Sequence, residues 1–274
     1  MATSSMKHTS KSRTLVARPV MLLSLRLFPL LGRLVCVILL LLGGLFFMGP
    51  FLFMVFTSLK STQQLFDGEL LSLPNPPVWG NYYKAWFVSA PFTLYLRNSL
   101  FVSSSVVLGT LVSCSLVAYS FARLEWKGRD LWFLVLLSTM MLPYQVTLIP
   151  VFLVFKYLGW LNTLLPLIVP SFFGNAFIIF LFRQFYLTVP RELDEAAIID
   201  GCNHFDVYWR ILLPLVKPAL AMGAIFVFIY SWNDFLGPLI YLNRPETFTL
   251  SLGLMAFRQQ YTVQWPLLMA ASLI

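Results

Sequence analysis

The 274-residue sequence has few charged residues, three cysteines and two histidines, and these shortages exclude several kinds of site. Cys36, Cys114 and Cys202 share no short spacing, which argues against a disulfide framework and against a zinc site. No lysine follows a glycine, so the chain lacks the Gly-Lys-Ser or Gly-Lys-Thr ending of a phosphate-binding loop. The His-Glu-x-x-His and Gly-x-Ser-x-Gly motifs are missing too. We therefore expect no catalytic residue, no metal and no cofactor on this chain.

Apolar residues make up 59% of the chain, whereas charged residues make up 11%. Uncharged runs longer than 20 residues recur, and such a run is long enough to cross the hydrocarbon core of a bilayer as a helix. The sequence therefore predicts an all-α polytopic membrane protein with six transmembrane helices. Their expected positions are 34–58, 98–121, 131–155, 161–182, 218–242 (interrupted by Asp234), and a sixth helix from near 261 that is incomplete at Ile274.

Prolines lie inside two of these expected helices. Pro143 and Pro150 fall in the third, and Pro166 and Pro170 fall in the fourth. Because proline removes a backbone donor and its ring clashes with the preceding turn, we expect both helices to be kinked. Kinks of this kind are common in transporters, but they do not identify one.

Small residues recur every four positions in the second and fifth expected helices. Ser105, Gly109 and Ser113 form one such series, and Ala219 and Gly223 form another. This spacing lets two helix backbones approach closely. We therefore expect these residues to serve helix packing rather than substrate binding.

Lysine and arginine are enriched in cytoplasmic loops of membrane proteins, which gives an orientation. Residues 1–33 contain six basic residues and no acidic one, so we expect a basic cytoplasmic N-terminal tail followed by a membrane domain at 34–274. The segment at about 187–217 is flanked by basic residues and is also expected inside. The connection 59–97 is expected outside. A basic inner face suits anionic lipid headgroups, and we expect no nucleic acid as a partner.

The most polar segment of the chain, ELDEAAIIDGCNHFDVYWRILLPL, lies between two long apolar stretches and holds five of the 11 acidic residues. It predicts a short helix, a break at Gly201 and a second helix that re-enters the membrane. Acidic residues in the first turn suit the positive end of the helix dipole. We expect a side chain at Gly201 to obstruct the turn. The alternative is an amphipathic helix lying among the headgroups. The second helix is expected to expose one apolar surface, formed by Phe205, Tyr208, Trp209, Ile211 and Leu212.

The spacing of residues in this polar segment favours two helices with a break between them over an amphipathic helix among the headgroups. Glu195-Ala196-Ala197, three residues, Gly201, nine residues and then Ile211-x-Leu213-Pro214 resembles the EAA loop of permease subunits of binding-protein-dependent ABC importers. Other stretches resemble the carbohydrate permeases related to the second membrane subunit of the maltose importer. These stretches are LRNSL (96–100), AYSFARLEWKGRD (118–130), MLPYQVTLIP (141–150) and YSWNDFLGPL (230–239), and the resemblance covers about 34–274.

The resemblance implies a type I importer in the cell inner membrane. Such an assembly has two six-helix permeases, here expected to be different chains, two ABC ATPase subunits that bind ATP and Mg²⁺, and an extracytoplasmic solute-binding protein. The chain itself is then not an enzyme. By the same resemblance Glu195 pairs with a basic residue of the ATPase, Ala196 and Ala197 line the contact, and Gly201 permits the turn. The remaining motif residues expected to take part in ATPase coupling are Asp200, Ile211, Leu213 and Pro214.

The prediction of the substrate depends on a small set of residues in the fifth expected helix. Asn233 and Asp234 are costly to place against lipid and are expected to face a translocation cavity. Tyr230 and Trp232 add aromatic faces, which suits a sugar such as a di- or oligosaccharide or a polyol glycoside. Helix capping and interhelical hydrogen bonding are the alternative role for the two polar residues. Glycerol phosphate or another small solute is the alternative substrate, and an ion channel, a secondary carrier or a membrane enzyme are the alternatives from other classes.

Overall fold

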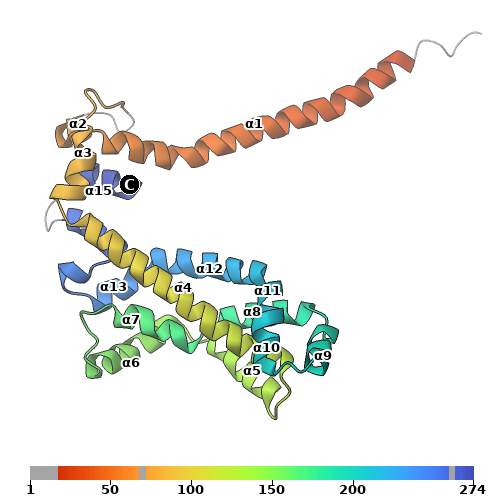
Figure 1. Ribbon diagram of the computed structural model, residues 1–274. Helices are drawn as coiled ribbons and strands as arrows, with labels where there is room; N and C mark the ends of the chain where they lie inside the picture. The colour runs from red at the N-terminus through yellow and green to blue at the C-terminus, as the bar shows by residue number, and fades with distance from the viewer. Residues whose placement is uncertain (1–17, 68–71, 259–262) are drawn as a thin grey trace, which may run out of the picture.

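The computed structural model describes residues 18–67, 72–258 and 263–274, and all the regular elements among them are helices (Figure 1). The expected all-α class is therefore confirmed. In chain order the elements are α1 (Arg18–Ser58), α2 (Thr62–Asp67), α3 (Gly80–Tyr83), the π-helix η1 (Lys84–Val88), α4 (Phe92–Arg123), α5 (Arg129–Thr139), α6 (Tyr144–Tyr157), α7 (Leu165–Ile168), the 3-10 helix η2 (Val169–Phe173), α8 (Ala176–Thr188), α9 (Glu192–Ile199), α10 (His204–Asp206), the π-helix η3 (Val207–Leu212), α11 (Leu213–Leu215), α12 (Lys217–Trp232), α13 (Leu236–Tyr241), the 3-10 helix η4 (Pro245–Thr247), α14 (Leu250–Gly253), the 3-10 helix η5 (Leu254–Phe257) and α15 (Trp265–Leu273).

Three helices of the described residues are long and apolar enough to cross a membrane: Gly32–Ser58, Phe92–Arg123 and Leu165–Thr188. Two bent pairs pass the same test if each counts as one span. These are α5 with α6, bent by 95°, and residues 204–215 with α12, bent by 76°. The sixth expected helix corresponds to α15, which has nine residues and so a length of about 14 Å. Its expected start near 261 lies outside the described residues.

The third expected helix is not continuous, and the break has a local cause. α5 ends at Thr139, and α6 begins after Pro143, which has extended backbone angles and precedes the first helical residue. The residue before a proline is also pushed out of the helical region. Pro150 lies inside α6 without ending it. The kink expected at Pro143 is thus a full break.

The fourth and fifth expected helices are also interrupted. Gly159 and Asn162 have φ values of 70° and 62°, so the chain turns there and the helix begins at Leu165, not at 161. Pro166 and Pro170 lie at the first positions of α7 and η2, where proline is tolerated. In the fifth, α12 ends at Trp232 and α13 begins at Leu236, with Asn233 and Asp234 between them.

α4 is the central helix, and it packs along α8, α12 and η2 (Figure 1). Glycines make these contacts close. A Cβ atom at Gly109 would lie 2.6 Å from Ser171 Oγ and 2.7 Å from Phe172 Cδ2 in η2. The expectation that Gly109 serves helix packing is confirmed, since no side chain fits there without displacing the side chains of Ser171 and Phe172.

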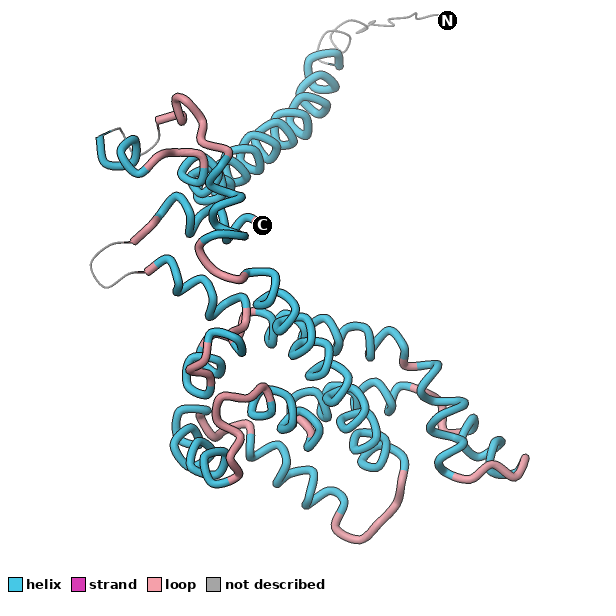
Figure 2. Tube along the Cα trace, turned by 60° about the vertical axis from the view of Figure 1, so that its left-hand side comes forward, coloured by secondary structure: helices cyan, strands magenta, loops and turns pink. Residues whose placement is uncertain are grey.

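The other end of α4 belongs to a second buried cluster, formed with η1, η5 and α15, and α15 also packs against α1. Both views show α15 lying beside the end of α1, away from α9 and α10 (Figures 1 and 2). The side-chain amide of Asn81 donates to the backbone oxygens of Ser58 (2.8 Å) and Lys60 (2.9 Å), and so holds the carbonyls at the end of α1. The buried residues of this cluster are Ala85, Phe92, Tyr95, Phe257, Ala270 and Ala271.

Candidate functional site

The polar segment begins with α9, as expected. Its first turn carries Glu192, Asp194 and Glu195, whose carboxylates favour the positive end of the helix dipole. The two alanines that follow lie on different faces. Ala196 is exposed, whereas Ala197 is only 5% exposed and packs into the main core. Ala196 therefore keeps the outer surface low, and Ala197 lets α9 lie close to its own bundle.

α9 ends in a left-handed turn at Gly201, whose φ is 87°. The N–H of Gly201 donates to the oxygen of Ile198 (3.0 Å), and the N–H of Cys202 donates to that of Ala197 (2.9 Å). A Cβ atom at 201 would meet no atom within 4 Å, so the expectation that a side chain would obstruct the turn is wrong. Glycine is favoured here because of the positive φ. Asp200, the C-cap residue, is exposed.

Asn203 starts the second helix. Its Oδ1 accepts hydrogen bonds from the backbone N–H groups of Phe205 and Asp206, both at 2.9 Å. This is the usual N-cap arrangement, which satisfies amide donors that have no partner within the helix. Sequence reasoning missed this cap, although an Asn directly before a helical stretch is a recognised signal for one.

The second helix does not expose a single apolar surface as expected. Tyr208 and Leu212 are 3% and 0% exposed and belong to the main core. Phe205 and Trp209 are 64% and 59% exposed, and their rings are stacked with centroids 6.4 Å apart. Ile211 is half-buried. Because the π-helix η3 shifts the period that a regular helix would give, these five residues divide between an inner and an outer face.

The motif ends where the chain turns back into the bundle. Leu213 is half-buried, and Pro214 is exposed in the first turn of α11. After Val216 the chain bends by 76° into α12. The second helix thus re-enters the apolar part of the protein as expected, but through a sharp bend rather than as one straight helix.

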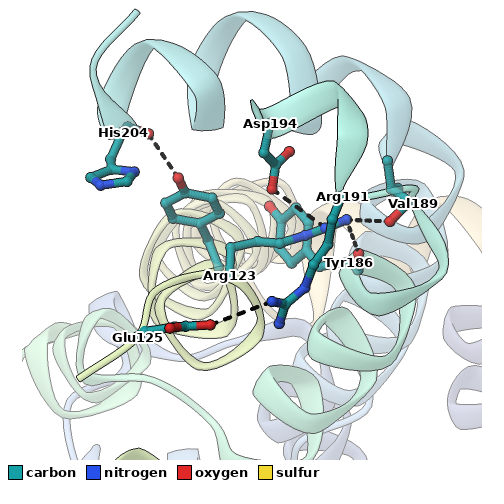
Figure 3. Close-up of polar contacts among 8 residues, drawn as sticks. Arg123, Glu125, Tyr186, Val189, Arg191, Asp194 and His204 are labelled. Atoms are coloured by element: carbon teal, nitrogen blue, oxygen red, sulfur yellow. Dashed lines mark hydrogen bonds and ion pairs between the residues drawn. The ribbon is translucent and has the colours of Figure 1, made fainter. Parts of the chain in front are cut away.

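One arginine at the end of α4 joins this segment to the bundle (Figure 3). Arg123 Nη1 lies 3.4 Å from Asp194 Oδ2, and Nη2 donates to the backbone oxygens of Tyr186 (2.5 Å) and Val189 (2.6 Å). The Arg123 side chain is 3% exposed. Sequence analysis did not single out Arg123, because nothing in the sequence shows that it meets Asp194.

The charge of Asp194 is set mainly by its burial. Burial raises the pKa of this carboxyl, while Arg123 and then Arg191 lower it and Glu195 raises it. The net result is a pKa above the usual value for an aspartate. Arg191 itself pairs with Glu125 at 3.5 Å in an exposed position, where solvent screens the pair (Figure 3).

The polar pair at 233 and 234 makes the hydrogen bonds of a helix-end role. The side-chain amide nitrogen of Asn233 donates to the backbone oxygen of Ile229 at 2.8 Å. Asp234 Oδ1 accepts from the N–H of Gly237 at 3.1 Å, in the first turn of α13. These bonds end α12 and begin α13, which is the capping alternative that the sequence left open.

Aromatic residues beside this pair lie at a surface. Tyr230 is 76% exposed, and Trp232 is half-buried and stacks on Phe228 with centroids 5.4 Å apart. A cavity of about 60 Å³ next to them is far smaller than the roughly 300–1,000 Å³ of most ligand pockets. It is lined by Val102, Val106, Leu167, Tyr230, Ser231, Asp234, Pro238 and Thr249.

Among the described residues, no three His, Cys, Asp or Glu side chains come close enough together to hold a metal ion. The cysteines at 36, 114 and 202 are all free.

Relatives of the chain have names that describe ABC transporter permeases. It is 37% identical to a putative ABC transporter permease of Caldicellulosiruptor sp., over 81% of this chain and 80% of that one. It is 32% identical to the arabinooligosaccharides transport system permease AraQ of Halalkalibacterium halodurans, over 82% and 81%. It is 33% identical to the sn-glycerol-3-phosphate transport system permease UgpE of Yersinia enterocolitica, over 87% of each chain.

A solved structure has the same fold. A chain of a bacterial ABC transporter involved in the import of the acidic polysaccharide alginate superposes with a TM-score of 0.77 at 23% identity, over 91% of both chains. Residues 105–274 match the family described as the inner membrane component of binding-protein-dependent transport systems. In this family the membrane component is separate from the subunits that hydrolyse ATP. The chain belongs to this family and is a multi-pass inner-membrane permease subunit of an ABC importer.

Proposed function

We propose that residues 192–215, hereafter the coupling loop, bind an ATPase subunit and carry its movement to the membrane bundle. The observation that carries this proposal is the loop's exposed outer face. Large apolar side chains on it are exposed, and such patches on soluble faces usually mark an interaction site. This loop surface consists of Glu195, Ala196, Ile198, Ile199, Phe205 and Trp209.

The chemistry of the loop surface indicates how the ATPase is held. Glu195 is exposed and faces no cation within its own chain at ion-pair distance among the described residues, so it is available to a basic residue of the ATPase. Ala196 beside it allows close approach of the partner backbone. The stacked rings of Phe205 and Trp209 supply the apolar area that most protein interfaces need at their centre.

Cross-linking tests this contact directly. With Cys202 replaced by serine, Ala196→Cys should form a cross-link to the ATPase subunit in the assembled importer when a short thiol-to-amine reagent is added. The control is Tyr83→Cys, because Tyr83 is 64% exposed and ends α3, which precedes α4 in the chain and lies far from Arg123 at the other end of α4. Equal cross-linking from both positions, or none from 196, contradicts a coupling role for this loop.

The assembly and orientation follow from the same function. We propose a second permease of different sequence, two ATPase subunits that bind ATP and Mg²⁺, an extracytoplasmic solute-binding protein and a cytoplasmic N-terminus. Lys84 in η1 and Lys127 after α4 lie near opposite ends of α4, which supports opposite sides of the membrane for them. Reporter fusions should place Lys127 inside and Lys84 outside, and the reverse pattern contradicts the orientation. Residues 1–17 of the basic tail lie outside the described residues.

The substrate we propose is a sugar, in the size range of di- or oligosaccharides or polyol glycosides. Support comes from the names of the relatives, which include an arabinooligosaccharide permease, and of the structural neighbour, which concerns a polysaccharide. The glycerol phosphate permease among the relatives keeps the phosphate ester as the second candidate. Calorimetry on the companion solute-binding protein distinguishes them: oligosaccharides should bind and glycerol phosphate should not.

We place Tyr230, Trp232, Asn233 and Asp234 along the translocation path, although two of them also cap helices. Support comes from the exposure of Tyr230 and from the polar residues at the break between α12 and α13. A cysteine at 230 should react with a membrane-impermeant thiol reagent, and sugar should slow that reaction. A cysteine at 225, which is also exposed on α12, serves as control. Labelling at 225 alone contradicts the placement.

A further inference from the structure

Three polar residues on one side of α4 each hold a different part of the coupling loop. They lie four residues apart, so they share a face of the helix, and we call them the α4 stripe. Their partners lie in η3, α10 and α9, so the stripe contacts three of the loop's four helical elements. The three contacts are Ser115 Oγ with the hydroxyl of Tyr208 (2.8 Å), the Tyr119 hydroxyl with the backbone oxygen of His204 (2.9 Å), and Arg123 with Asp194 (3.4 Å).

The ion pair of the stripe differs from the other ion pairs of the described residues. The side chains of Arg123 and Asp194 are 3% and 15% exposed, whereas every other pair includes at least one partner that is more than 70% exposed. Exposed pairs are screened by water and contribute little. Arg123 also holds the end of α8 through Tyr186 and the connection to α9 through Val189 (Figure 3). One buried side chain therefore ties α4, α8 and α9 together.

The ion pair between Arg123 and Asp194 leaves several buried polar atoms without a hydrogen bond. Arg123 Nε, Asp194 Oδ1 and the Tyr186 hydroxyl are buried, and none of them has a hydrogen-bond partner. Buried polar atoms are normally paired, so three spare atoms around one ion pair call for an explanation. Nε is thus an unused donor and Oδ1 an unused acceptor on the two partners of the same ion pair. The site thus has the donors and acceptors for a second arrangement.

We propose that the α4 stripe is the joint through which movement of the coupling loop reaches the bundle, with Arg123 as its positioning residue. This inference rests on the coupling function proposed above. Charge-assisted hydrogen bonds have a fixed direction, so they transmit a shift of α9 along α4. Apolar contacts have no preferred direction and allow one surface to slide over the other. Because α4 packs on both α8 and α12, a shift of α4 moves the centre of the bundle.

The test measures transport per ATP hydrolysed in the complete importer, reconstituted with its ATPase and solute-binding protein. Asp194→Asn keeps the shape of the side chain but removes its charge, and should lower this ratio about tenfold, the effect of losing one charge-assisted hydrogen bond. The matched control is Glu125→Gln, which removes a carboxylate from the exposed pair with Arg191 and should change the ratio less than twofold. Arg123→Lys keeps the charge and should fall between them. A wild-type ratio for Asp194→Asn overturns the proposal.

A double variant separates transmission from stability. Arg123→Met with Asp194→Leu replaces the pair by apolar side chains, which often restores or increases stability. We expect its melting temperature to lie above that of Asp194→Leu alone, which leaves the Arg123 charge buried and unpaired, and below that of the wild type, because the backbone oxygens of Tyr186 and Val189 lose a donor. Transport per ATP should stay low. If transport per ATP recovers in the double variant, the α4 stripe does not transmit movement, and the ion pair has only a structural role. If the double variant does not insert, Asp194→Asn alone decides.

Failure of this proposal is distinguishable from failure of the coupling function. The loop surface is unchanged in Asp194→Asn, so the ATPase should still co-purify with the permease in wild-type amount. Loss of the ATPase from Asp194→Asn also overturns the joint, since the ion pair then only shapes the docking surface. Absence of cross-linking from position 196 in the wild-type background contradicts the coupling function itself.

Discussion

Gly223 in α12 packs directly against the ring of Phe182 in α8. A Cβ atom at 223 would lie 2.6 Å from Cζ and 2.7 Å from Cε1 of that ring. Phe182 is 1% exposed and belongs to the main core, so a side chain at 223 would have to displace a buried ring. The close approach of α12 and α8 therefore depends on the missing side chain, which confirms the packing role expected from the spacing of Ala219 and Gly223.

The first prediction concerns this contact. Gly223→Val overpacks the interface between α8 and α12 and should reduce the free energy of unfolding by about 1–3 kcal/mol. Thermal unfolding in detergent measures the change. Gly44→Val is the control, because a Cβ atom at 44 meets no atom within 4 Å. Equal losses from both substitutions contradict the contact.

The second prediction concerns the turn at Gly201. Because φ is 87° and the surrounding space is open, the penalty depends on backbone preference and not on side-chain volume. Gly201→Val should weaken the turn by about 1–2 kcal/mol, whereas Gly201→Asn should cost less because asparagine tolerates left-handed angles. Hydrogen exchange of the amides at 198–203 measures the local opening. Similar protection in the two variants contradicts this explanation.

The third prediction is a pH dependence from Asp194. The groups that act on its carboxyl are Arg123, Arg191, Glu195 and His204, and burial outweighs them and raises its pKa. A raised pKa in the folded state means that the folded protein binds this proton more readily than the unfolded chain. The stabilisation is therefore complete below the unfolded value, about pH 4, and is lost as the pH rises through the folded pKa.

Melting temperatures measure this dependence. The melting temperature of the wild type minus that of Asp194→Asn should decrease as the pH rises from about 4 towards neutrality. The subtraction removes the titration of the other groups common to both proteins. If the difference in melting temperature increases with pH instead, the ion pair with Arg123 outweighs burial. The pKa of Asp194 is then lowered in the folded protein, which contradicts this prediction.

The fourth prediction concerns the end of α1. Asn81→Ala removes both donors to the carbonyls of Ser58 and Lys60 and leaves buried acceptors unpaired, which should cost about 1–3 kcal/mol. The expected result is a lower melting temperature and faster exchange at the end of α1. Gln64→Ala is the control, because the Gln64 hydrogen bond to Asn75 is exposed. A neutral Asn81→Ala contradicts an anchoring role.

Much of the fold could be predicted because the membrane imposes its own pattern. The uncharged runs predicted the positions of the main helices, and the small residues at 109 and 223 predicted where helices are in contact. The ends and bends of the helices were harder to predict. The sharp break at Pro143 and the turns at Gly159 and Asn162 follow from local backbone preferences that a hydrophobic run conceals.

The candidate site was partly visible in the sequence. Gly201 and Glu195 were found because the motif spacing fixes them. Arg123 was not, because its partner lies 71 positions away and only the packing of α4 on α8 brings the two together. The division of Phe205, Tyr208 and Trp209 between two faces was also missed, since the π-helix η3 shifts the period that a regular helix would give.

The central claim is that the coupling loop binds the ATPase through Glu195 and its neighbours. The most direct measurement is the affinity of the purified ATPase for membranes containing Glu195→Lys, compared with Glu246→Lys, which makes the same charge change at an exposed position near the other end of α4. We predict normal insertion of both variants, with an affinity at least about 30-fold weaker for Glu195→Lys because like charges then meet at a desolvated contact. Uptake should fail in that variant alone. Wild-type affinity and uptake with Glu195→Lys would contradict the account.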